Sequence, residues 1–133
     1  MVAVVNLEPI KVAFTSSIGN PSQSDAFKRL EEIVPLKGYK FYATYDSVTC
    51  EYCACVKIEE GQDENVYSLP IKTISGGLYA TSQLKGDFKE IVCRIAPEFE
   101  RLSREVKSDN SRLPIEFYKS HRHIILHLPV LSD

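Results

Sequence analysis

The same order of segments occurs twice along the chain, and this duplication restricts the folds that it can adopt. Residues 12–20 (VAFTSSIGN) and residues 78–86 (LYATSQLKG) each lead into a helical segment. Two strand-like segments then follow in each half, KFYATYDS and CACVKIEE in the first and LPIEFYKS and IILHLPVL in the second. A period of half the chain is too long for a solenoid. We therefore expect an α+β fold of two β-α-β-β units, over residues 8–60 and 68–131, related by a pseudo-two-fold axis with a central ligand cleft.

Two helices are expected from apolar residues that recur at helical spacing. The first helix should follow the turn signal Gly19-Asn20-Pro21 and end at Pro35–Gly38. The second should begin at a capping-box pattern, in which Asp87 precedes Glu90 by three residues, and Pro97 should kink or split it. The apolar stripes consist of Ala26, Phe27, Leu30, Ile33 and Val34 in the first helix, and of Phe88, Ile91, Val92, Ile95, Phe99, Leu102 and Val106 in the second.

Segments rich in aromatic and β-branched residues, bounded by turn signals, predict the strands. A chain of 133 residues suits one core, so we expect one domain over residues 1–133. The expected strands are Ile10–Ser16, Lys40–Asp46, Tyr52–Glu59, Leu69–Ile74, Leu78–Leu84, Leu113–Lys119 and His123–Val130.

Charge and composition exclude several classes of protein. The net charge of −2, from 16 basic and 18 acidic residues, gives no large positive field for phosphate groups. The N-terminal apolar run has no basic region before it and is interrupted by Asn6 and Glu8, so it matches neither a signal peptide nor a membrane span. We expect a cytoplasmic protein that contacts neither membranes nor nucleic acid directly. A DNA-binding role would need a further domain or a partner protein.

The cysteines raise the question of a metal site. Cys50-x-x-Cys53 has the spacing of half a structural zinc site, but the usual second pair is missing. Histidines at positions 121, 123 and 127 could complete the site only if folding brought them together. A chain with this apolar core and no secretion signal needs no disulfides, so we expect reduced thiols packed as small apolar side chains. We predict no metal and no cofactor.

The segment LPIEFYKS contains the acidic residue of greatest interest. Strand alternation places Pro114, Glu116 and Tyr118 on one face, and a carboxylate among such apolar residues needs compensation for its lost hydration. The duplication gives Tyr45 the position that Tyr118 has in the other half. A carboxylate ringed by aromatic side chains is a good receptor for a lipophilic cation. The candidate ligand-binding residues are Glu116, Tyr118, Tyr79, Tyr45, Phe41 and Tyr42.

A simpler interpretation stays open at this point. Glu116 could lie on a solvated sheet edge, and the tyrosines could be half-buried sheet residues, which is the ordinary place of both residue types.

Three segments give the chain a resemblance to a known family. Residues 74–80 (ISGGLYA), 85–88 (KGDF) and 113–118 (LPIEFY) occur in the order and spacing of the GyrI-like small-molecule-binding family, whose domain also serves as effector-binding module in AraC-type and MerR-type multidrug regulators. Phe41–Asp46, Tyr52–Val56 and Ile124–Val130 resemble further strands of that family. The chain departs from many members in having no tryptophan and in having Pro97 in the second helix.

The resemblance implies that Glu116 meets cationic ligands, with aromatic residues around it. It also implies a multidrug-sensing or sequestering role, either as the effector domain of a transcription regulator or as a stand-alone binder. Two other functions stay open. One is hydrolysis of reactive electrophilic natural products with Glu116 as general base, and the other is a protein-interaction role such as gyrase inhibition.

Overall fold

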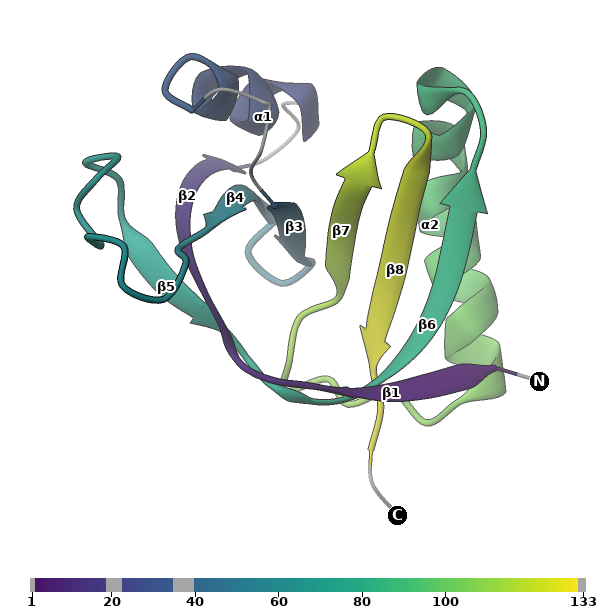
Figure 1. Ribbon diagram of the computed structural model, residues 1–133. Coiled ribbons are helices and arrows are strands. Elements are labelled where there is room, and N and C mark those ends of the chain that lie inside the picture. The colour runs from purple at the N-terminus through teal and green to yellow at the C-terminus, as the bar shows by residue number, and fades with distance from the viewer. Residues whose placement is uncertain (1, 19–22, 35–39, 132–133) are drawn as a thin grey trace.

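The computed structural model describes residues 2–18, 23–34 and 40–131 as one mixed α+β structure (Figure 1). Eight strands form one curled antiparallel sheet in the order β1-β6-β8-β7-β3-β4-β2-β5. The elements are β1 (Ala3–Leu7), β2 (Ile10–Ile18), α1 (Gln23–Glu31), β3 (Phe41–Asp46), β4 (Glu51–Lys57), β5 (Ile71–Ile74), β6 (Gly77–Lys85), α2 (Phe88–Glu105), β7 (Ile115–Ser120) and β8 (His123–Pro129).

The strand order has the symmetry that the duplication predicts. The units β2-α1-β3-β4 and β6-α2-β7-β8 meet where β3 pairs with β7. The counterparts are β2 and β6, β3 and β7, and β4 and β8, with β1 and β5 at the two edges. Exchanging the members of each pair gives the same strand order read from the opposite edge of the sheet. The expected α+β class and the two β-α-β-β units are therefore confirmed.

One strand was absent from the sequence-based expectation. β1 pairs with β6, the first strand of the second unit, and β5 pairs with β2, the first strand of the first unit. Each unit is thus extended by the strand that precedes the other unit. The short segment of β1 contains Asn6 and shows no strict alternation, so its pairing depends on β6 rather than on a pattern of its own.

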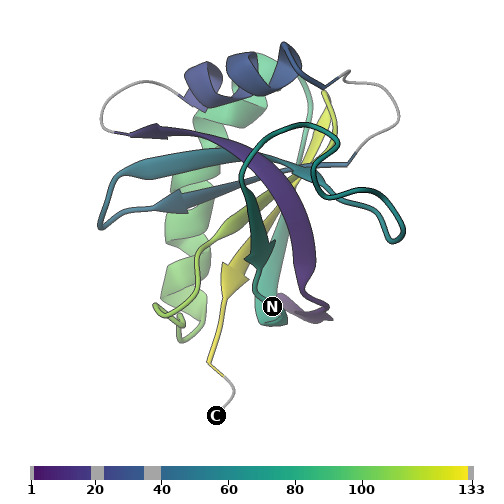
Figure 2. The ribbon, with the colours of Figure 1, turned by 90° about the vertical axis from the view of Figure 1, so that its left-hand side faces the viewer.

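Both helices cover the outer face of the curled sheet (Figure 2). Ala26 and Leu30 of α1, with Val34 just after its end, pack against Phe41, Ala43, Ala54 and Val56 of β3 and β4. Ile91, Ile95 and Leu102 are the buried residues of α2, and they pack against β6 and β8. Most of the predicted apolar stripes thus supply the two helix-to-sheet cores, whereas Ile33 and Phe88 were expected in the stripes and are exposed.

Two predictions about α2 need correction. Pro97 does not split the helix, because α2 runs from Phe88 to Glu105 and buried residues on both sides of the proline hold it against the sheet. Asp87 takes the N-cap position but makes no side-chain capping hydrogen bond, so the predicted capping box does not form. The predicted turn at Gly19-Asn20-Pro21 and the predicted helix end at Pro35–Gly38 lie outside the described residues.

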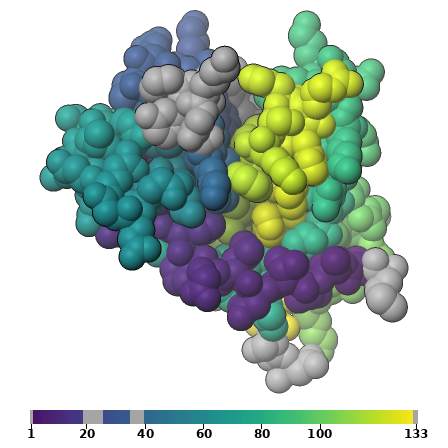
Figure 3. Space-filling view, in the orientation of Figure 1, coloured from purple at the N-terminus to yellow at the C-terminus, as the bar shows by residue number. Residues whose placement is uncertain are grey.

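The inner face of the curled sheet has its own apolar cluster. Figure 3 shows this side of the molecule, with β5 in teal, β7 and β8 in yellow and β1 in purple. The buried members of this cluster are Val12, Tyr42, Cys53, Cys55, Ile74, Tyr79 and Ile115.

Arg112 holds the end of the sheet where β1, β6 and β8 meet. Its guanidinium donates hydrogen bonds to the carbonyl oxygens of Gly76, Leu78 and Val130 and pairs with Asp109 at 3.0 Å. A Cβ added at Gly77, which has a φ of 129°, would lie 2.7 Å from Arg112 Nη1. A side chain at this position would therefore displace the guanidinium from its partners.

We predict that Gly77→Ala destabilises the protein more than Gly86→Ala. Both glycines have strongly positive φ angles, 129° and 139°, but a Cβ at Gly86 meets nothing within 4 Å. Displacing Arg112 should add about 1–3 kcal/mol to the loss of stability, because buried acceptors lose their donor. Urea unfolding of both variants measures the difference. Equal losses would show that the Arg112 contacts contribute little.

Candidate functional site

Glu116 lies at the junction of the two units. It is the cross-strand partner of Ala43 in the β3–β7 pair, and the duplication gives these two residues equivalent positions. The pseudo-two-fold axis therefore passes between them. Partners across a ladder point to the same face, so Glu116 shares the outer face with Ala43 and with Leu126 of β8.

Two tyrosines hydrogen-bond the Glu116 carboxylate. Tyr118 donates to Glu116 Oε1 at 2.5 Å, and Tyr52 donates to the same oxygen at 3.0 Å. The two hydroxyl oxygens lie 3.2 Å apart. Tyr52 comes from β4, two strands away from β7, so the sheet brings both hydroxyls to one carboxylate oxygen.

The carboxylate is buried without a cationic partner among the residues that the structure describes. Glu116 is 4% exposed. The ion pairs within residues 2–18, 23–34 and 40–131 all involve other acidic side chains. Two hydroxyl donors compensate only part of the hydration that a buried carboxylate loses.

The pKa values reflect this incomplete compensation. Burial raises the pKa of Glu116 above the ordinary 4.5, although the hydrogen bonds from Tyr118 and Tyr52 act in the opposite direction. Burial and the nearby Glu116 charge raise the pKa of Tyr118 and of Tyr52. Both tyrosines therefore remain protonated donors at neutral pH.

Aromatic rings from both helical segments surround the tyrosine pair. Phe27 of α1 packs edge-on against Tyr118, with ring centroids 4.8 Å apart, and lies 6.3 Å from the Tyr52 ring. Phe88, at the start of α2, lies 6.5 Å from the Tyr118 ring and is 39% exposed. The carboxylate thus lies in an aromatic setting between the two helices.

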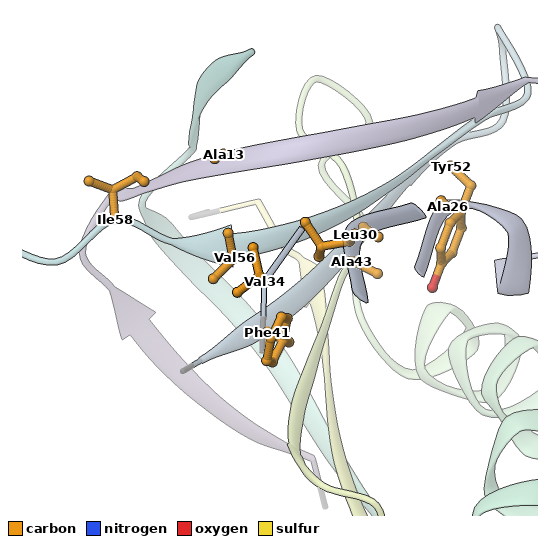
Figure 4. Packing of buried hydrophobic residues seen from close by; sticks show 10 residues of the cluster. Ala13, Ala26, Leu30, Val34, Phe41, Ala43, Tyr52, Val56 and Ile58 are labelled. Atoms are coloured by element: carbon orange, nitrogen blue, oxygen red, sulfur yellow. The ribbon is translucent and has the colours of Figure 1, made fainter. Parts of the chain in front are cut away.

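Phe41 and Tyr45 also belong to the outer face. Phe41 pairs with Tyr118 across the β3–β7 ladder and is buried in the α1 core, as Figure 4 shows. Tyr45 pairs with Tyr52 across the β3–β4 ladder, but it is 41% exposed. The structure therefore brings Phe41 next to the carboxylate site and leaves Tyr45 at its margin.

Tyr42 and Tyr79 lie on the inner face, across the sheet from Glu116. The Tyr42 ring stacks on Phe117, with centroids 4.8 Å apart. The Tyr79 hydroxyl donates to the Ser75 carbonyl oxygen at 2.5 Å, and the guanidinium of Arg112 lies 4.7 Å from the Tyr79 ring centroid. These two residues share no surface with Glu116, and their part in ligand binding stays a prediction.

Besides Phe88, which was expected only as part of the second helical stripe, two residues of the site were not among the candidates. Tyr52 points to the outer face because it pairs with Tyr45, so the register of the β3–β4 hairpin would have identified it. Phe27 was expected only as part of a helical core stripe. Figure 4 shows Tyr52 beside Ala26 of α1, with its hydroxyl directed away from the strand.

The cysteines do not form a metal site in the described part of the chain. Cys53 and Cys55 are buried, whereas Cys50 and Cys93 are exposed. No group of three His, Cys, Asp or Glu side chains among the described residues could hold a metal ion. Neither of the two described helices is long and apolar enough to cross a membrane.

Comparison with known proteins identifies the fold. The chain matches no protein-family model and no curated protein. It resembles the integron cassette protein VCH_CASS2 from the mobile metagenome of Vibrio cholerae, with a TM-score of 0.76 and 13% identity over 98% of this chain and 95% of the other.

Two further solved structures have the same fold. SAV2435, solved bound to tetraphenylphosphonium, gives a TM-score of 0.65 and 10% identity over 99% of this chain and 94% of the other. A hydrolase from Listeria innocua gives a TM-score of 0.62 and 14% identity over 98% and 91% of the two chains. At these identities the likeness concerns the fold alone.

We predict that Glu116→Gln stabilises the protein at neutral pH. When a carboxyl group has a higher pKa in the folded than in the unfolded protein, the folded protein loses stability as the pH rises from about 4.5 through the folded pKa. The glutamine carbonyl still accepts hydrogen bonds from both tyrosines but carries no charge to bury. Denaturant unfolding over this pH range should show a fall in stability for the wild type that the variant lacks. Identical pH profiles would contradict the account.

Proposed function

We propose that this protein binds small lipophilic organic cations at Glu116, between α1 and α2. The observation that supports the proposal most directly is the buried carboxylate of Glu116, which two tyrosine hydroxyls hydrogen-bond and which lacks a cationic partner among the described residues. A bound cation would supply the positive partner that this carboxylate lacks.

The surroundings of Glu116 favour a delocalised cation over a small hydrated one. Tyr52, Tyr118, Phe27 and Phe88 present aromatic rings, whose faces attract positive charge and whose area binds apolar groups. Both tyrosine hydroxyls already donate hydrogen bonds to Glu116 Oε1. The carboxylate can therefore attract a cation that has no N–H group to donate. Tyr118 and Phe88 are partly exposed, which gives a ligand an approach to the carboxylate.

The comparisons are consistent with this proposal. SAV2435, which shares the fold, was solved bound to tetraphenylphosphonium, a lipophilic cation. The resemblance of residues 113–118 to the GyrI-like family also implies that Glu116 contacts a cationic ligand. We propose multidrug sensing or sequestration as the biological use, in an effector domain of a transcription regulator or in a stand-alone binder.

Calorimetric titration with tetraphenylphosphonium tests the proposal. The wild type should bind it, and Glu116→Gln should weaken binding at least about tenfold, since a desolvated charge pair is lost. Glu100→Gln is the matched control, because it removes one carboxylate from the exposed side of α2. Triphenylphosphine oxide, a neutral compound with similar rings, should bind both wild type and Glu116→Gln weakly and equally.

Equal affinity of wild type and Glu116→Gln for tetraphenylphosphonium would place the ligand elsewhere. Equal weakening in Glu116→Gln and Glu100→Gln would reduce the effect to net charge.

Hydrolysis of reactive electrophiles is a second candidate, favoured by the raised pKa of Glu116. A buried carboxylate of raised pKa is a better general base near neutral pH. In epoxide opening, Glu116 would take a proton from water while the water oxygen bonds to carbon and the carbon–oxygen bond of the epoxide breaks. Tyr118 would protonate the released oxygen and regain its proton from Glu116, to which its hydroxyl is hydrogen-bonded. Incubation with styrene oxide and mass analysis separates the two functions. Diol formation that Glu116→Gln abolishes supports catalysis, and unchanged epoxide supports binding alone.

A further inference from the structure

We propose that the inner face of the curled sheet is a second binding site, which takes small lipophilic anions such as arylsulfonates through the ammonium group of Lys72. This site lies across the sheet from Glu116 and does not depend on the function proposed for that residue.

Lys72 reaches across the inner face. It lies on the edge strand β5, where it pairs with Val12, and its ammonium group donates to Thr44 Oγ1 on β3 at 2.7 Å. Strands β2 and β4 lie between β5 and β3 in the sheet, so the side chain spans two strands inside the curl. The ammonium group also lies 5.0 Å from the centroid of the Phe14 ring. The cation is thus held over an apolar surface.

Lys72 has no carboxylate partner among the described residues. Other cations near this face do have one, since Lys57 pairs with Glu59 at 3.8 Å and Arg112 pairs with Asp109 at 3.0 Å. Burial lowers the pKa of His127 to about 4, so this inner-face histidine is neutral at physiological pH. A half-buried ammonium group that contacts the Thr44 hydroxyl and the Phe14 ring, and no carboxylate of the described residues, favours an anionic ligand.

The neighbouring thiols respond to this positive charge. Burial raises the pKa of Cys53 and of Cys55, the latter to about 12, so neither thiol ionises to neutralise the lysine. At both thiols Lys72 is the strongest charge acting against that rise in pKa. The positive charge of Lys72 therefore acts on both thiols of the inner face.

Aromatic surface for the ligand's apolar part lies on the same face. Phe14 and Phe117 are half-buried, and Phe117 stacks on the buried ring of Tyr42. Ile125, the ladder partner of Phe117, is also half-buried. An arylsulfonate can place its rings against this surface and its oxygens at the lysine.

Titration with anilinonaphthalenesulfonate, followed by fluorescence, tests the proposal. Lys72→Met should weaken binding about tenfold, because a charge-assisted contact is lost. Lys11→Met is the matched control, since Lys11 lies on the opposite face and pairs with Glu64. Phenylnaphthylamine has the same rings without the sulfonate, so its affinity should be equal in wild type and Lys72→Met. Glu51→Gln should strengthen binding of the sulfonate, since it removes the opposing charge.

Amide NMR spectra of the wild type keep the test decisive if Lys72→Met fails to fold. Anilinonaphthalenesulfonate should shift the signals of Phe14, Cys53 and Lys72 rather than those of Glu116 and Tyr118. Unchanged affinity in Lys72→Met, equal weakening in Lys11→Met, or shifts confined to the Glu116 side would each overturn the proposal.

Discussion

The buried charge of Glu116 is only partly compensated by its hydrogen-bond donors, and the proposed cation site follows from this. The sheet buries the carboxylate at the junction of its halves, and the hydroxyls of Tyr52 and Tyr118 are its hydrogen-bond donors among the described residues. A buried carboxylate with two neutral donors remains less stable than a solvated one. The protein thus carries a locally unfavourable charge, which is the condition under which a bound cation contributes most.

The duplicated fold gives this charge its position. The pairing of β3 with β7 joins the two units, and α1 and α2 cover the two halves of the outer face. The residue equivalent to Glu116 in the first unit is Ala43, so the symmetric fold carries one carboxylate where it could carry two. Two carboxylates on directly paired positions of neighbouring strands would repel each other. The small side chain of Ala43 instead leaves room for Tyr52 and Tyr118 beside Glu116.

The sequence predicted local features better than contacts between distant strands. Alternation placed Glu116 and Tyr118 on one face, and helical spacing identified Leu30, Ile91 and other core residues. Alternation within one strand does not tell which face of another strand it shares, so Tyr79 was expected beside Glu116 although it lies on the inner face. The strand β1 and the role of Tyr52 also depended on ladder register between separate segments. The features that could not be predicted, β1, the role of Tyr52 and the face of Tyr79, thus depend mainly on pairing between distant strands.

Carbon-detected NMR titration of the Glu116 carboxyl group, with and without tetraphenylphosphonium, measures both the cost of its buried charge and its pairing with the cation. We expect a pKa above 4.5 in the free protein and a lower pKa in the presence of the cation, because binding of a cation and ionisation of Glu116 favour each other. A pKa at or below 4.5 in the free protein would contradict the incomplete compensation of the charge. A raised pKa that the cation leaves unchanged would show that the ligand does not bind at Glu116.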